Sequence, residues 1–184
     1  MREIRAWQVL ESDYLVERPW LSLRRDRVLT GNGATIDEFH VLEVPTWACV
    51  CCIDEEGQLI LIRQYRHGIG RVTLELPAGV IEASESPLDG ARRELFEETG
   101  YTSDDWTALA TFAPEPARHT HLAYCFVARR ARCTSQQSLD EVEDLVVESF
   151  PVSDLMLLIG SGEITHAVHV AALLWAKQRG LLEP

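Results

Sequence analysis

Three glutamates, Glu94, Glu97 and Glu98, follow one another at helical spacing in the middle of the chain. At positions i, i+3 and i+4 of a helix their carboxylates project from one side. Like charges at this spacing repel one another, so a cation is expected to offset them. Arg93 can reach Glu97, but one arginine does not neutralise three acids. Oxygen ligands favour a hard divalent cation such as Mg²⁺ or Mn²⁺, and a solvated acidic helix face is the simpler alternative.

The spacing of the surrounding residues argues against that simpler alternative. Gly79 is followed by five residues, Glu85, seven residues, and then the run Arg-Glu-Leu-Phe-Glu-Glu-Thr-Gly-Tyr, which starts at Arg93 and ends at Tyr101. This pattern resembles the Nudix hydrolase box, GX5EX7REUXEEXGU, in which U is a large aliphatic residue. Every fixed position matches. The one departure is Tyr101, where an aliphatic residue is usual.

The resemblance implies a loop-helix-loop that binds Mg²⁺, with Mn²⁺ as a substitute, and hydrolyses a nucleoside diphosphate linked to another moiety. By position, Glu94 and Glu98 resemble the main metal ligands of the family. Glu97 would support or share a metal ion, and Ala78 would add its backbone carbonyl. Arg93 would orient a carboxylate through a charge-assisted hydrogen bond.

Residues outside the box resemble the ADP-ribose pyrophosphatase branch, which acts on ADP-ribose and related nucleoside diphosphate sugars. The runs Arg-Gln-Tyr-Arg-His from Arg63 and Glu-Leu-Pro-Ala-Gly from Glu75 carry this resemblance. In that branch an arginine at the position of Arg66 contacts the diphosphate, and an exposed arginine at the end of a strand is the alternative. Arg63 is a further candidate for substrate binding.

A proline some fifteen residues beyond the box also marks the branch, and Pro116 stands fifteen residues after Tyr101. Family ADP-ribose enzymes often continue as Pro-Gly with an acid shortly after, whereas Pro116 is followed by Ala-Arg-His-Thr-His. Pro116 and Arg118 are expected to lie near the substrate. The departure leaves the identity of the sugar open, though not the reaction type.

The acidic stretch of residues 139–144 resembles the mobile acidic loop of the branch, which supplies a glutamate to activate water. Glu141 is the first choice for this base and Glu143 is the second, with a solvated acidic loop as the alternative. Trp20 lies where the branch offers an aromatic residue to stack on the purine, often across a dimer with exchanged N-terminal strands. A tryptophan in the core is the alternative for Trp20.

Two histidine pairs could suggest a metal site. His119 and His121 share the face of an expected strand, and His166 and His169 share the face of an expected helix. Neither pair has a third partner nearby in the sequence, so we expect no metal at either pair. The first pair could touch substrate, because its strand leaves the Pro116 loop.

The elements that position these residues indicate an α/β or α+β layered domain. Ser86, Pro87 and Asp89 predict the start of a helix, and Gly100 predicts its end. Strands are expected at 41–52, 58–65, 72–76, 106–113, 122–129 and 145–150, and helices at 153–159 and 163–178. The resemblance implies a Nudix α/β/α sandwich with a mixed sheet over residues 46–184. Residues 1–45 read as short strands with a turn at Gly31–Gly33, and are expected to form a small antiparallel β region that mediates dimerisation, with strand exchange as an option.

Composition limits the partners. The chain has 184 residues, with 29 acidic against 17 basic residues and a formal net charge of −12. Clustered Lys and Arg are what hold phosphate backbones, so neither nucleic acid nor an anionic membrane is an expected partner. The five cysteines lack the paired spacing of a zinc site, and free thiols suit a reducing cytoplasm. Much of the charge is local: residues 79–101 carry −4 and residues 139–148 carry −5.

These features together predict a homodimeric enzyme that hydrolyses the diphosphate of a nucleoside diphosphate sugar, with Mg²⁺, to a nucleoside monophosphate and a sugar phosphate. One alternative is a nucleotide-binding module that kept the fold and lost catalysis, although every box carboxylate is present. Another is a hydrolase of dinucleotide polyphosphates, NADH or RNA caps. The acidic charge and the Pro116 spacing disfavour the RNA-cap and dinucleotide polyphosphate activities.

Overall fold

The structure is a computed structural model that describes residues 3–183 and falls into two compact units. Residues 3–45 and 113–121 form the first unit, and residues 46–112 and 122–183 form the second. The division of the chain after residue 45 lies where the sequence suggested a domain boundary. That residues 113–121 belong with the N-terminal unit was not predicted from the sequence.

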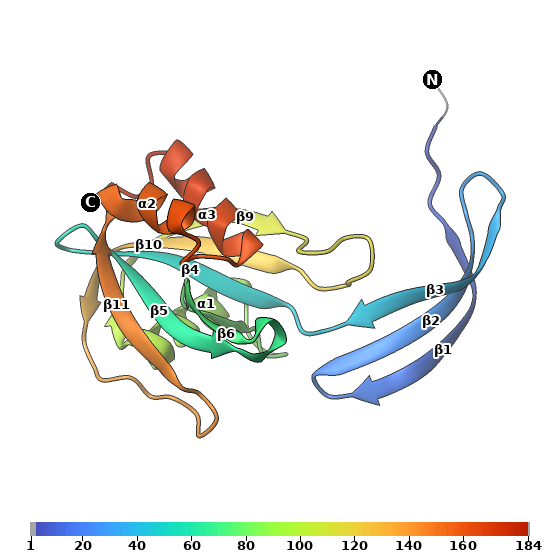
Figure 1. Cartoon of the computed structure of the whole chain (residues 1–184), viewed down its shortest axis with the longest axis horizontal. Coiled ribbons are helices and arrows are strands. Elements are labelled where there is room, and N and C mark those ends of the chain that lie inside the picture. The colour runs from blue at the N-terminus through green and yellow to red at the C-terminus, as the bar shows by residue number, and fades with distance from the viewer. Residues whose placement is uncertain (1–2, 184) are drawn as a thin grey trace. The chain divides into compact units, whose positions relative to one another are not determined.

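The N-terminal unit is built on three antiparallel strands, β1 (Gln8–Arg18), β2 (Leu21–Leu29) and β3 (Thr35–Glu43) (Figure 1). They are longer than the short strands that the sequence suggested. The predicted turn joins β2 to β3, and Gly33 has a φ of 89°, which favours glycine. Every residue of β1 is exposed.

The segment 113–121 joins this unit through backbone pairing. The Leu42 N–H donates to the Arg118 carbonyl at 2.8 Å, and the Thr120 N–H donates to the Leu42 carbonyl at 3.1 Å. The Arg118 guanidinium lies 5.6 Å from the centre of the Phe39 ring. These contacts fasten the segment to β3, so its backbone is held along the N-terminal sheet.

The second unit contains an eight-stranded mixed sheet. Its strands are β4 (Trp47–Asp54), β5 (Gln58–Arg66), β6 (Arg71–Glu75), β7 (Ala78–Val80), β8 (Tyr101–Thr102), β9 (Asp105–Phe112), β10 (Ala123–Cys133) and β11 (Leu145–Pro151). The order is β11-β5-β4-β10-β8, while β6, β7 and β9 pair with β5, β4 and β10 respectively. Only β4 and β10 run parallel among the described strands, which makes the sheet mixed.

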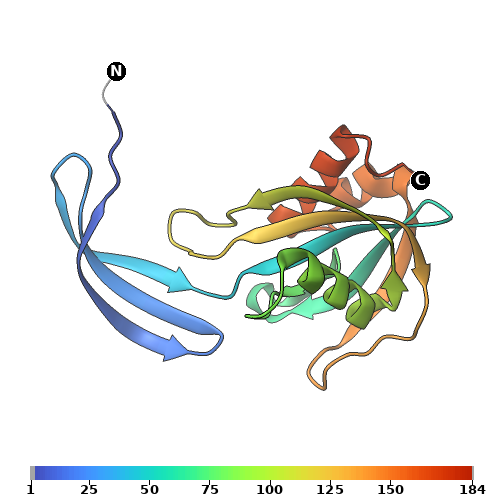
Figure 2. The ribbon, with the colours of Figure 1, turned by 180° about the vertical axis from the view of Figure 1, so that it is seen from behind.

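Helices cover both faces of this sheet. Helix α1 (Pro87–Thr99) lies on one face, and α2 (Leu155–Ser161) and α3 (Ala167–Gln178) lie on the other (Figures 1 and 2). Alternate residues of β4 explain this, because Cys49 and Cys51 pack with α2 and α3, whereas Val50 and Cys52 pack with α1. The predicted α/β/α sandwich is therefore confirmed.

The sequence signals of α1 are confirmed in detail. The Asp89 N–H donates to Ser86 Oγ at 3.2 Å, so Ser86 is the N-cap, and Gly100 ends the helix at a φ of 73°. A Cβ at Gly100 would lie 2.1 Å from the Ser135 carbonyl oxygen, which gives a second reason for glycine. The helix thus begins and ends at fixed residues, and this fixes which way its glutamates point.

Several predicted boundaries were wrong. The strand expected at 41–52 is divided at Pro45, which has no N–H to donate, into β3 and β4. Pro77 ends β6 but does not end the sheet, because β7 follows directly and pairs with β4. The last helix begins at Ala167 rather than at residue 163, and a 3₁₀ turn (Val152–Asp154) precedes α2. Within residues 3–183 no helix is long and apolar enough to cross a membrane.

Candidate active site

Helix α1 and strand β7 bring the box carboxylates against backbone atoms. Glu94 and Glu98 are 8% and 4% exposed, and the Ala78 N–H donates to Glu98 Oε2 at 2.8 Å. A Cβ added at Gly79 would lie 2.1 to 2.2 Å from the carboxyl atoms of Glu94. A side chain at residue 79 would therefore displace the Glu94 carboxylate from its place beside β7.

Arg93 ties the cluster together through ion pairs and a backbone contact. Its Nε and Nη2 bind both oxygens of Glu85 at 2.8 and 3.0 Å, and its Nη1 donates to Glu94 at 2.8 Å and to Glu97 at 3.0 Å. Its Nη2 also donates to the Val80 carbonyl at 2.8 Å. One guanidinium thus orients three carboxylates, a wider role than the single contact expected from the sequence.

The electrostatics of the cluster indicate a place for a further cation. Burial raises the pKa of Glu98 to about 8, against the hydrogen bond from Ala78, and burial also raises the pKa of Glu94. The negative charge of Glu143 adds to both shifts. A cation would relieve this crowding, and carboxylate oxygens are ligands that hard divalent ions prefer.

The available ligand atoms, carboxylate and carbonyl oxygens, are of the type that a divalent metal prefers. The residues that would hold it are Glu94, Glu98 and the Ala78 carbonyl, with Glu97 in support. In the part of the chain that the structure describes, no three Asp, Glu, His or Cys side chains already converge as a metal site. Arg93 binds Glu94 and Glu97 instead, so these carboxylates would exchange that partner for the metal.

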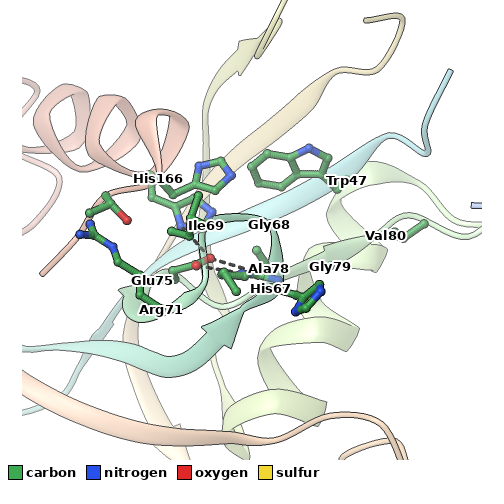
Figure 3. Close-up of a pocket in the computed structure, with 13 residues that line it drawn as sticks. Trp47, His67, Gly68, Ile69, Arg71, Glu75, Ala78, Gly79, Val80 and His166 are labelled. Atoms are coloured by element: carbon green, nitrogen blue, oxygen red, sulfur yellow. Dashed lines mark hydrogen bonds and ion pairs between the residues drawn. The ribbon is translucent and has the colours of Figure 1, made fainter. Parts of the chain in front are cut away.

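A cavity of about 770 Å³ lies beside β7 (Figure 3). It is lined by Trp47, Arg66, His67, Gly68, Ile69, Arg71, Glu75, Ala78, Gly79, Val80, Thr165, His166 and His169. Ala78 and Gly79 thus face the cavity and also contact the buried glutamates of α1. A phosphate group in the cavity would therefore lie close to the carboxylate cluster.

Arg66 is held in this cavity by Glu75. Its Nε and Nη2 donate to the two carboxylate oxygens at 2.9 and 2.7 Å, and Thr73 Oγ1 donates to Glu75 Oε1 at 2.6 Å. Glu75 is 1% exposed, whereas the Arg66 side chain is 44% exposed. Glu75 therefore fixes the guanidinium from behind and leaves its other edge open to the cavity.

Because of this pairing, the free energy of unfolding is expected to fall at acid pH. Burial by itself would raise the pKa of Glu75, but hydrogen bonds from Arg66 and Thr73 outweigh it and lower that pKa from 4.5 to about 2. The stabilisation is present above about pH 4.5 and is lost as the pH falls from 4.5 towards 2. We expect Glu75→Gln to remove about 3 kcal/mol of unfolding free energy at pH 7 and less at pH 3.

Urea unfolding of both proteins at the two pH values measures this effect. Glu38→Gln is the control, because its carboxylate is 64% exposed and should contribute under about 1 kcal/mol at either pH. A deficit of Glu75→Gln that stays the same at pH 7 and pH 3 would contradict the assignment.

His166 and His169 also reach the cavity, together with Trp47. The two imidazole rings stack at 4.1 Å, and the Trp47 ring meets both edge to face at 5.3 and 5.6 Å. The Leu76 N–H donates to His169 Nδ1 at 3.3 Å, so the proton of the neutral ring resides on Nε2. The Glu75 carboxylate lies 3.7 Å from His169 Nδ1. That the pair lines a cavity could not be read from the sequence.

Two known protein families match this chain. The family described as NUDIX domain matches residues 43–173, and the family described as nucleoside diphosphate sugar hydrolase N-terminal domain matches residues 7–42. The chain belongs to the Nudix family. Nudix hydrolases as a class use a divalent metal, which agrees with the oxygen donors of the cluster.

Relatives of this Nudix hydrolase include ADP-ribose pyrophosphatases. The protein of Bacillus subtilis is 29% identical over 145 residues, which is 78% of each chain. That of Mycobacterium tuberculosis is 27% identical over 170 residues, 91% of this chain and 82% of the relative. The crystal structure of an ADP compounds hydrolase matches with a TM-score of 0.85 at 24% identity, over 98% of this chain and 100% of that one.

Two of the predicted substrate ligands of the Nudix hydrolase have other partners in the structure. Arg63 binds Glu148 at 3.1 Å and Glu163 at 2.8 Å, and it does not line the described cavity. Arg118 lies over Phe39 in the N-terminal unit, and Pro116 belongs to the same segment. Their contribution to substrate binding stays a prediction, whereas Arg66 is found in the cavity.

Trp20 and the histidines of the same unit also differ from part of what the sequence suggested. Trp20 is 72% exposed between β1 and β2, so the alternative of a core tryptophan is wrong. His119 and His121 do not lie on one strand, because β10 begins only at Ala123. Their rings are 5.4 Å apart.

The two candidate bases lie in the loop before β11. Both side chains are exposed, and the Asp140 N–H donates to the Glu143 carboxylate at 2.9 Å. Of the two, Glu143 is the residue whose charge acts on Glu94 and Glu98. This proximity favours Glu143, the second choice from the sequence, and the assignment of the base stays a prediction.

Proposed function

We propose that this Nudix hydrolase cleaves the diphosphate of a nucleoside diphosphate sugar, ADP-ribose or a close relative, in a Mg²⁺-dependent reaction. The products are a nucleoside monophosphate and a sugar phosphate. One observation carries the proposal: the cavity that holds Arg66 is lined by the β7 residues that contact Glu94 and Glu98. The relatives named ADP-ribose pyrophosphatase and the match of residues 7–42 support the same substrate class.

Each of these residues has a separate role in an in-line displacement at phosphorus. Arg66 donates hydrogen bonds to diphosphate oxygens and stabilises the negative charge that grows on them during the reaction. Glu143, ahead of Glu141, accepts a proton from the attacking water, whose oxygen forms the new P–O bond as the anhydride P–O bond breaks. Glu94, Glu98 and the Ala78 carbonyl would hold Mg²⁺, which when bound would supply positive charge and lower the pKa of water. Arg93 keeps the carboxylates aligned.

A panel of substrates tests this proposal. We expect turnover of ADP-ribose, ADP-glucose or GDP-mannose with Mg²⁺, and loss of turnover when a chelator removes the metal. Preference for diadenosine polyphosphates or NADH would favour the dinucleotide alternative. Tight nucleotide binding without turnover of any member would show a binding module that has lost catalysis.

We also propose that the N-terminal unit forms a homodimer. All residues of β1 are exposed, and large apolar side chains remain uncovered there: Val9, Leu10, Tyr14, Leu15 and Val16. A three-stranded sheet needs a packed apolar face to be stable in water. A second copy would provide that cover. The exposed Trp20 is separately proposed to stack on the base of a substrate.

Light scattering tests the dimer. Leu10→Glu combined with Val16→Glu should convert the protein from two chains to one and lower its activity. Leu157→Glu on α2 is the control, because Leu157 is 70% exposed in the other unit and should leave the mass unchanged. A wild-type mass of one chain would refute the proposal.

A further inference from the structure

One wall of the cavity has no role in the reaction described above. It consists of the Trp47 indole and the His166 imidazole, with His169 stacked behind (Figure 3). Figure 3 shows Trp47 and His166 side by side along the edge of the cavity, away from Glu75 and Arg71. This aromatic wall is therefore available to a part of the substrate other than the diphosphate.

The wall is uncharged at neutral pH. Burial lowers the pKa of His166, and burial with the neighbouring His166 lowers the pKa of His169 to about 3. Neutral imidazoles do not attract a phosphate as arginines do. A metal ion is also disfavoured, since the His169 Nδ1 already accepts the Leu76 N–H and no three metal-ligating side chains converge in the part of the chain that the structure describes.

Two polar atoms in this wall lack partners. His166 Nδ1 and His169 Nε2 are both buried without a hydrogen bond, and the His169 side chain is 1% exposed. Buried polar atoms are nearly always paired in folded proteins. Since solvent reaches neither of these two atoms, a ligand in the cavity would contact the wall through the Trp47 and His166 rings that line it.

We infer that Trp47 and His166 form the subsite for the sugar of the substrate, the half beyond the diphosphate. This inference rests on the proposed function and names the part of the substrate that the cavity recognises. A sugar ring offers an apolar C–H face to the Trp47 indole and a hydroxyl to the His166 imidazole, both of which line the cavity. Pockets of this type combine a mostly apolar lining with a few placed polar groups. Sites built to bind hydroxyls discriminate strongly against substrates that lack them.

Matched substrates and variants test the inference. The substrates are ADP-ribose and the methyl ester of ADP, which keeps the nucleotide and diphosphate but has no sugar. We expect Trp47→Leu to lower kcat/KM for ADP-ribose about tenfold or more and for the methyl ester less than about threefold, because only ADP-ribose has a sugar ring to lie against the indole. Trp47→Phe keeps a ring and should retain most of the difference.

Two further variants separate packing from recognition. His166→Phe keeps the aromatic wall and removes its nitrogens, so it should also reduce the preference for ADP-ribose. Trp175→Leu makes the same change as Trp47→Leu at a half-exposed position of α3 outside the cavity. It should change kcat/KM for neither substrate. Inhibition by ribose 5-phosphate should weaken in Trp47→Leu while inhibition by AMP stays the same.

An equal loss for both substrates in Trp47→Leu, or an unchanged ratio, would overturn the subsite and leave the proposed function standing. If the wild type hydrolyses neither substrate, the proposed function fails, and equilibrium binding then decides the inference. Equal Kd values for ADP-ribose and the methyl ester would overturn it, whereas tighter binding of ADP-ribose that Trp47→Leu abolishes would support it.

Discussion

Glu98→Gln is expected to lower kcat by about 10³-fold or more, because a metal site contributes several kcal/mol to transition-state stabilisation. The fold should not suffer. Without metal the pKa of Glu98 is about 8, so the group is mostly protonated at pH 7 and glutamine has the same shape and charge. Steady-state kinetics with saturating Mg²⁺ measure the loss, and circular dichroism and thermal melting check the fold.

A matched variant makes this result specific to the metal site. Glu82→Gln changes an exposed carboxylate outside the cluster near the start of α1 and should keep most of the activity. Mg²⁺ should raise the Tm of the wild type and of Glu82→Gln, and should not raise that of Glu98→Gln. Near-normal turnover of Glu98→Gln would remove Glu98 from the metal site.

Glu143→Gln has the second largest expected effect, a fall in kcat of about 10² to 10⁴-fold, because it removes the group that takes the proton from water. Glu143 lies within electrostatic reach of Glu94 and Glu98. Metal affinity should change little. The pH dependence of kcat is the decisive measurement, since the limb that reports the base should disappear.

Glu141→Gln is the control for this experiment. It lies in the same acidic loop and removes the same charge, so it should change kcat by less than about tenfold if Glu143 is the base. A large loss in Glu141→Gln with normal turnover in Glu143→Gln would return the role to Glu141. Equal small effects in both would mean that neither glutamate is the base.

Local sequence signals predicted the helix and its glutamates well. Ser86 and Gly100 determine where α1 begins and ends, and their requirements are local: a hydroxyl for a free N–H and a backbone with positive φ. The continuous apolar run of β4 is likewise typical of a strand that is buried on both faces. Since each of these signals lies within a few residues, no knowledge of distant contacts is needed.

Contacts between distant residues could not be predicted in this way. Trp47 and His166 are 119 positions apart, and only the packing of α3 on the sheet brings their rings together. The preference for Glu143 depends on the course of a loop that has no regular pattern. Arg63 carried the same motif resemblance as Arg66, but its partner Glu148 arrives from β11, which lies beside β5.

The ion pairs of Arg93 bear on how tightly the enzyme can hold its metal. Glu94 and Glu97 already have a cationic partner, so metal binding exchanges one counterion for another rather than filling an empty anionic site. Separating the guanidinium from these carboxylates would offset part of the electrostatic free energy of metal binding. We therefore expect the occupancy of the site by metal to follow the concentration of free Mg²⁺.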